Sequence, residues 1–87
     1  MTPIGQPIES GDNIYCVTLS PDGTVLATAS AGHNLVRLYD ITDKSRPRPI
    51  GQGLTFRLFV RAVAISPDGN VLAVGGNDQT ISLWRLR

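Results

Sequence analysis

The sequence has little of what a disulfide framework, a metal site or a membrane span requires. Its 87 residues include one cysteine and one histidine. Cys16 has no second cysteine to pair with, which excludes a scaffold held together by internal disulfides. His33 stands without cysteine or carboxylate neighbours at ligand spacing, so we expect no metal and no other cofactor. No apolar run approaches the roughly 18 residues that a membrane span needs.

Charge of one sign is also scarce. Eight Lys and Arg residues against seven Asp and Glu residues leave a net charge of +1. Proteins that bind nucleic acid by neutralising phosphates usually carry a basic stripe, so we expect no nucleic-acid partner. Residues 1–5 have neither the basic start nor the apolar core of a signal peptide. We therefore expect a soluble chain that is located in the cytoplasm and binds no membrane.

Groups that could perform catalysis are missing as well. Cys16 lies in an apolar segment without a base beside it, which is typical of a buried structural thiol. Asp22 and Asp68 each stand in a Ser-Pro-Asp-Gly element, where aspartate stabilises a turn. No glycine-rich phosphate loop and no metal-ligand spacing occurs. The sequence therefore predicts that the protein is not an enzyme.

An internal repeat organises the chain. The second copy follows the first at an offset of 46 residues, a period found in propeller blades and in helical arrays. Three identical elements recur in register: Pro-Ile-Gly-Gln (residues 3–6 and 49–52), Ser-Pro-Asp-Gly (20–23 and 66–69) and Val-Leu-Ala (25–27 and 71–73).

Both copies have the pattern of an all-β protein. Short segments rich in Val, Ile, Leu and Thr alternate with turn residues every 8 to 12 positions or so. The pattern predicts strands at Ile14 to Leu19, Val25 to Ser30, Leu35 to Ile41, Val60 to Ile65, Val71 to Gly76 and Thr80 to Leu86. A weaker strand is expected at Pro3 to Ile8 and again at Pro49 to Leu54, where proline suits an edge strand. The strand from Ile14 has no plainly polar face, so we expect it to be covered on both sides.

These motifs resemble the WD-repeat β-propeller family over nearly the whole chain. The second copy carries the features most fully: a Ser-Pro-Asp-Gly turn between two apolar strands, then Asp78 and Thr80, then Leu83-Trp84. The first copy repeats the turn and has Leu38-Tyr39 in place of Leu83-Trp84. The family's hydrogen-bonded network of His, Ser or Thr, Asp and Trp is incomplete in both copies, since Val74 stands at its hydroxyl position in the second.

The resemblance implies an all-β fold of two four-stranded antiparallel blades. Residues 1–13 would form an outer strand and its loop, residues 14–54 the first blade, and residues 55–87 a second blade without its own outer strand. Two blades cannot close a ring, so the outer strand would complete the second blade of another copy as a clasp. The clasp residues implied are Pro3, Ile4 and Ile8 on one copy and Ile81, Leu83 and Leu86 on the next.

Such a head-to-tail contact between identical chains either closes into a ring or continues as a filament. Two blades per chain give an even number of blades, and propellers usually hold four to eight. We expect a homotetramer with eight blades, with a homotrimer of six blades as the second choice.

The resemblance also suggests which side chains contact partners. Tyr15 and Arg61 occupy matching positions on the innermost strands, at the mouth of the channel, where they would bind a protein or peptide. Trp84 and Tyr39 would pack between blades. Two hypotheses follow: a non-catalytic scaffold that assembles itself and offers an interaction surface, or a purely structural two-blade unit, minimal or engineered, with no partner beyond itself.

Overall fold

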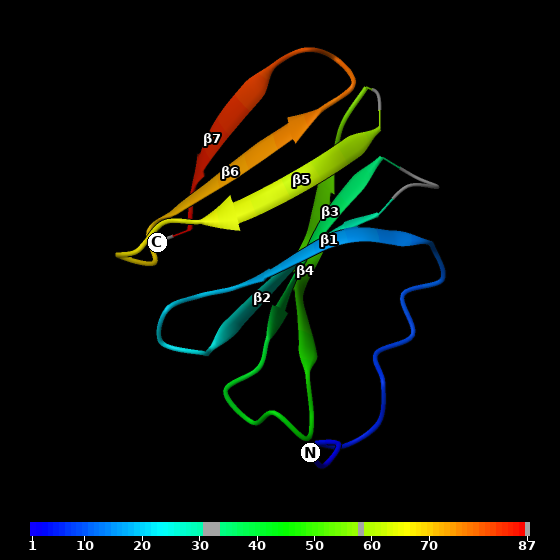
Figure 1. The fold of residues 1–87 in the computed structure, drawn as a ribbon, viewed down its shortest axis with the longest axis vertical. Coiled ribbons are helices and arrows are strands. Elements are labelled where there is room, and N and C mark those ends of the chain that lie inside the picture. Colours follow the sequence, from blue (N-terminus) through cyan, green and yellow to red (C-terminus); the bar gives the residue numbers. More distant parts are fainter. Residues whose placement is uncertain (31–33, 58, 87) are drawn as a thin grey trace.

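The computed structural model describes residues 1–30, 34–57 and 59–86. Within them the regular structure is entirely β, in two antiparallel sheets (Figure 1). Blade 1 consists of β1 (Ile14–Leu19), β2 (Val25–Ser30), β3 (Leu35–Asp40) and β4 (Arg48–Thr55). Blade 2 consists of β5 (Val60–Ile65), β6 (Val71–Gly76) and β7 (Ile81–Arg85). The all-β prediction is confirmed, and these strands match the expected ones to within one residue at each end. In the described part of the chain, no helix could cross a membrane.

The two Ser-Pro-Asp-Gly elements form matching turns. The hydroxyl of Ser20 donates to Asp22 Oδ1 at 2.7 Å, and the same carboxylate accepts the Thr24 backbone N–H at 3.0 Å. In the second turn the hydroxyl of Ser66 donates to Asp68 Oδ1 at 2.6 Å. Both aspartates are therefore turn-forming residues, as the sequence predicts.

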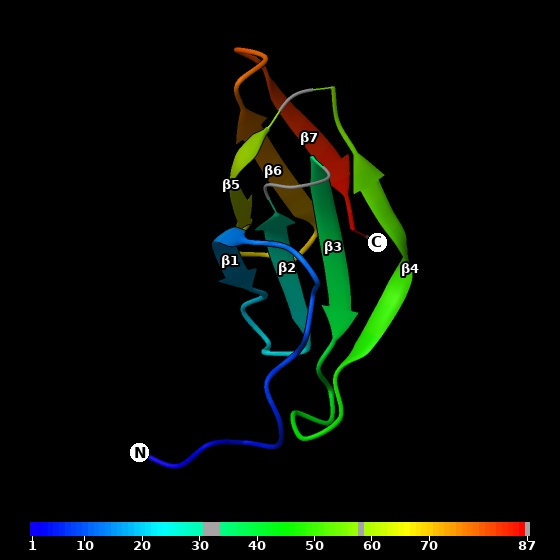
Figure 2. The same cartoon turned by 90° about the vertical axis from the view of Figure 1, so that its right-hand side faces the viewer.

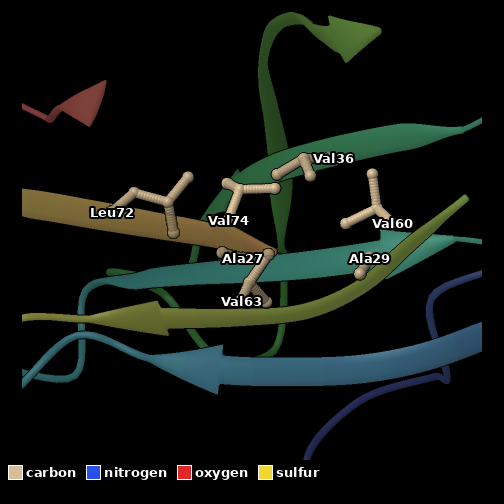
Figure 3. Packing of buried hydrophobic residues seen from close by; sticks show 7 residues of the cluster. All are labelled: Ala27, Ala29, Val36, Val60, Val63, Leu72 and Val74. Atoms are coloured by element: carbon tan, nitrogen blue, oxygen red, sulfur yellow. The ribbon is translucent and has the colours of Figure 1, made fainter. Parts of the chain in front are cut away.

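The hydrophobic core lies between the two blades, where β5 packs against β1 and β2. Blade 1 presents mainly small side chains to it and blade 2 larger ones, so side chains of blade 2 can pack closely on blade 1. The buried residues are Ala27, Ala29 and Val36 of blade 1, and Val60, Val63, Leu72 and Val74 of blade 2 (Figure 3).

The expectation that β1 is covered on both sides is wrong for the single chain. Blade 2 covers the side that carries Cys16, whose thiol lies 3.6 Å from the Val63 carbonyl oxygen. Val17 and Leu19 point to the other side and are 57% and 59% exposed. One chain supplies only one neighbouring blade, so the second apolar face of β1 faces solvent.

The strand expected at Pro3 to Ile8 is also absent from the single chain. Residues 1–13 contain bends but no strand. They leave β1 on the side of blade 1 that faces away from blade 2, as both views show (Figures 1 and 2). They pair with no strand of the described chain, and a segment without such pairing stays irregular. The two sheets hold four and three strands, the numbers expected for a chain whose second blade lacks an outer strand of its own.

Candidate functional site

Tyr15 and Arg61 lie at equivalent β-bulges. The pairing of β1 with β2 shifts between Ile14 and Cys16, and the pairing of β5 with β6 shifts between Val60 and Ala62. Each shift leaves one residue unpaired, Tyr15 in the first blade and Arg61 in the second. A bulge turns a side chain out of the regular alternation of the strand, and bulges are frequent next to functional sites.

The bulges bring these two side chains together. The guanidinium carbon of Arg61 lies 5.2 Å from the centroid of the Tyr15 ring, a cation–π contact. Arg61 Nε also donates a hydrogen bond of 3.1 Å to Asn77 Oδ1. Both Tyr15 and Arg61 are exposed. The structure thus joins two residues that the sequence placed at matching positions, and it adds Asn77.

The turn that holds Asn77 is fixed by the next residue. Asp78 accepts the Thr80 backbone N–H at 3.0 Å and the Thr80 hydroxyl at 2.8 Å. These hydrogen bonds, with a smaller contribution from the charge of Arg57, lower the pKa of the Asp78 carboxyl group. The turn therefore keeps a negative charge that is close enough to Arg57 to interact with it.

A second candidate site is the outer edge of β7. This strand pairs with β6 on one side, and no strand among the described residues pairs with its other side. Ile81 and Leu83 are 79% and 71% exposed. On the N-terminal segment, Ile4 and Ile8 are also exposed, next to Pro3. The chain thus carries an unpaired sheet edge and an unpaired apolar segment.

Leu86, the third residue expected at this edge, lies outside β7. It follows the end of β7, its backbone N–H donates to the Asn70 carbonyl oxygen at 2.7 Å, and its side chain packs partly against the core. Leu86 therefore anchors the end of β7 to blade 2.

Trp84 lies on the side of β7 that faces blade 1. Its ring meets Phe56 edge to face, with centroids 6.1 Å apart, and remains 40% exposed. The indole N–H donates to the Ser82 hydroxyl at 2.9 Å. Ser82, which lies on β7 together with Trp84, thus supplies the hydroxyl group that is missing at Val74. The comparison of motifs did not indicate this role for Ser82.

Tyr39, the residue equivalent to Trp84, is only 4% exposed, although it lies on the open face of blade 1. Figure 2 shows the N-terminal segment crossing in front of this face. On the same face the hydroxyl oxygen of Thr28 is buried and has no hydrogen-bond partner in the described part of the chain. Among the described residues, Asn34 Oδ1 and Arg37 Nε are buried without a hydrogen-bond partner as well.

The outward face of blade 2 carries small residues at the positions equivalent to the blade 1 surface on which blade 2 packs. It contains a shallow apolar hollow of about 230 Å³. By the repeat offset, Ala62, Ala64, Ala73 and Gly75 of this hollow correspond to Cys16, Thr18, Ala27 and Ala29, the blade 1 surface on which blade 2 packs.

Other residues singled out in the sequence carry no site. His33 lies outside the described residues, as does Leu58. Among residues 1–30, 34–57 and 59–86, no group of three histidine, cysteine or acidic side chains could hold a metal. Cys16 is half-buried between the blades.

Comparisons with known proteins agree with this geometry. The family model described as "WD domain, G-beta repeat" matches residues 3–40 and 53–85. None of the curated proteins compared with the chain matches it. Among solved structures, a chain of the "Crystal Structure of Mitotic Checkpoint Complex" superimposes with a TM-score of 0.78 at 18% sequence identity. The superposition covers 92% of this chain and 26% of that one, so this chain spans about a quarter of its length.

Proposed function

The chain belongs to the WD-repeat family, and we propose that its copies associate head to tail into a closed propeller that binds a protein or peptide. WD repeats form non-catalytic scaffolds for protein interaction. The finer proposal, association between copies, is carried by one observation: the two open faces of the chain are the repeat equivalents of the two faces already packed together inside it.

The packed interface provides the template for this association. Inside the chain, Val63, Leu72 and Val74 of blade 2 enter the small-residue face of blade 1. The equivalent residues of blade 1 are Val17, Leu26 and Thr28, on the face that points away from blade 2; Val17 is exposed there, whereas Thr28 is buried. The equivalent small residues of blade 2 line its hollow. The open face of blade 1 in one copy therefore fits the open face of blade 2 in another.

The N-terminal segment leaves the chain on the side where that neighbouring copy would lie (Figure 2). Its sequence repeats that of β4, which pairs with β3 through Leu38 opposite Ile50 and Val36 opposite Leu54. The second copy follows at 46 residues up to β6 and at 45 residues in β7, where Leu83-Trp84 corresponds to Leu38-Tyr39. Transferring the register with these offsets places Ile4 opposite Leu83 and Ile8 opposite Ile81. The segment would then supply the fourth strand of the neighbour's blade 2, with Pro3 opposite Trp84.

Four copies would close a ring of eight blades, and three copies one of six. Eight blades require a smaller rotation between successive blades than six, and both numbers fall within the usual range for propellers. We favour the tetramer, located in the cytoplasm, with the exposed Tyr15 and Arg61 on the innermost strands as the surface that meets a partner.

Cysteine cross-linking between two differently substituted chains tests the clasp. One chain carries Ile4→Cys and the other Leu83→Cys, both with Cys16→Ser. Because each chain has only one cysteine, a disulfide between the two kinds of chain must be intermolecular. Oxidation of the mixture is expected to give a product containing one chain of each kind, since residues paired across strands lie within disulfide range.

The matched control moves one cysteine two residues along β7, pairing Ile4→Cys with Ile81→Cys. This pair is out of register and should cross-link much more slowly. Equal rates for both pairs would contradict the proposed strand pairing, as would the absence of any product containing both chains.

A further inference from the structure

We propose that Arg61, held by Tyr15 and Asn77, is a binding site for a carboxylate group of a partner peptide. The inference rests on the interaction role proposed above, but it needs only one chain, because all three residues belong to the same copy. Its subject is the chemical group that the exposed residues Tyr15 and Arg61 recognise.

The guanidinium of Arg61 is oriented before any partner arrives. Its central carbon lies over the Tyr15 ring, 5.2 Å from the ring centroid, and its Nε atom donates to Asn77 Oδ1. These contacts leave the two terminal Nη groups without a hydrogen-bond partner in residues 1–30, 34–57 and 59–86. A guanidinium presents its N–H groups as a planar fork, and a carboxylate accepts two of them at once. A fixed fork binds with less loss of side-chain entropy than a mobile one.

The charge of Arg61 favours an anionic ligand. Arg61 contacts no carboxylate of residues 1–30, 34–57 and 59–86, so no acidic group of these residues pairs with its charge. Asp78, one residue after Asn77, has its pKa lowered mainly by hydrogen bonds from Thr80 and in small part by the charge of Arg57. A cation with two unused Nη groups attracts an anion, and a carboxylate can accept a hydrogen bond from each of them.

Assembly would multiply the site. Each copy in a ring contributes one Arg61 near the channel mouth, so an acidic peptide with several carboxylates could engage more than one copy. Linked binding events of this kind raise the overall affinity without new contacts.

Fluorescence anisotropy at physiological salt tests the proposal with three labelled probes. They are hexaglutamate with an amidated C-terminus, hexaglutamine with an amidated C-terminus, and hexaglycine with a free C-terminus. We expect the first or the third probe to bind the wild-type chain, and the hexaglutamine probe not to bind. Binding of hexaglutamate identifies side-chain carboxylates as the ligand, whereas binding of hexaglycine alone identifies a terminal carboxylate.

Three variants show whether binding depends on the fork. Arg61→Gln removes the charge, Arg61→Lys keeps the charge without the fork, and Arg46→Gln removes one charge from the loop between β3 and β4. Loss of charge-assisted hydrogen bonds should weaken binding about tenfold for both Arg61 variants. Arg46→Gln should change affinity by less than about twofold, because an exposed charge far from the site is screened.

Equal weakening by Arg61→Gln and Arg46→Gln would overturn the proposal, since binding would then follow net charge. Failure of every carboxylate probe to bind would overturn it as well. Light scattering on the same samples separates this result from the assembly proposal. Binding by a single-chain species that depends on Arg61 would leave the carboxylate site standing and contradict the ring, and a ring without binding would do the reverse.

Discussion

Two glycines of β4 share a backbone conformation but differ in their surroundings. Gly51 and Gly53 have φ angles of 64° and 83°, a region that side chains with a Cβ atom adopt at a cost. An added Cβ at Gly53 would lie 2.6 Å from the Val36 backbone oxygen, whereas one at Gly51 meets nothing within 4 Å. Gly53 is thus fixed by conformation and by space, and Gly51 by conformation alone.

We therefore expect Gly53→Ala to lower the free energy of unfolding by about 3 kcal/mol, and Gly51→Ala by about 1 kcal/mol. Urea denaturation of both variants measures the difference. Equal losses would show that β4 does not approach β3 as closely as the structure has it.

The turn carboxylates predict how stability changes in acid. In each, hydrogen bonds from a nearby hydroxyl group and backbone N–H lower the pKa from its ordinary value of 3.8; the residues are Asp40, Asp43, Asp68 and Asp78. The unfolded chain therefore binds protons at higher pH than the folded chain does. Stability should be complete above the ordinary carboxyl pKa and should fall as the pH drops below it, toward the lowered values.

Melting temperatures measured between pH 7 and pH 2.5 check this prediction. Replacing the four aspartates by asparagine, which does not titrate, should flatten the profile below about pH 4. An unchanged acid profile in that variant would show that other groups control acid unfolding.

At the scale of single residues, sequence reasoning found the aspartate turns because their mechanism is local. It did not find Asn77 or Ser82. Asn77 binds Arg61, which is distant in the sequence, and Ser82 binds Trp84, two positions further along β7. The equivalence of Tyr15 and Arg61 was visible in the repeat, but their contact depends on two β-bulges that no local motif indicated.

Among the elements, β7 approaches blade 1 through an aromatic contact. Trp84 joins it to blade 1 through Phe56, yet 40% of the side chain is exposed. Full burial would make Trp84→Ala cost about 3–5 kcal/mol, so we expect a smaller loss of about 2–3 kcal/mol. Thermal unfolding measures it, with Trp84→Phe, which keeps an aromatic ring against Phe56, as the milder control. A Trp84→Ala melt like that of the wild type would contradict the packing of β7 on blade 1.

Strand positions could be read from the sequence because turn residues mark their ends in both copies. Pro3 to Ile8 shows the limit of that approach. Its sequence repeats that of β4, but the same residues form a strand only where an edge is available, and β4 has β3 beside it. Strand formation here depends on tertiary pairing and not on local preference.

In the whole molecule, two open faces and one open strand edge match other parts of the same chain. Head-to-tail association of copies would cover all three. An isolated chain exposes apolar residues on β1 and β7, and surfaces of this kind mark interaction sites in soluble proteins. The N-terminal segment contributes by pairing in trans, so deleting residues 1–8 should reduce the assembled species even though the core between the blades is intact.

Absolute mass in solution, measured by light scattering over a range of concentrations, tests this claim most directly. The account predicts four times the 9.3 kDa of the chain, with three times that mass for a six-blade ring. The chain without residues 1–8 should have a lower mass or aggregate, because the edge of β7 stays unpaired. A uniform single-chain mass for the intact protein at every concentration would contradict head-to-tail association.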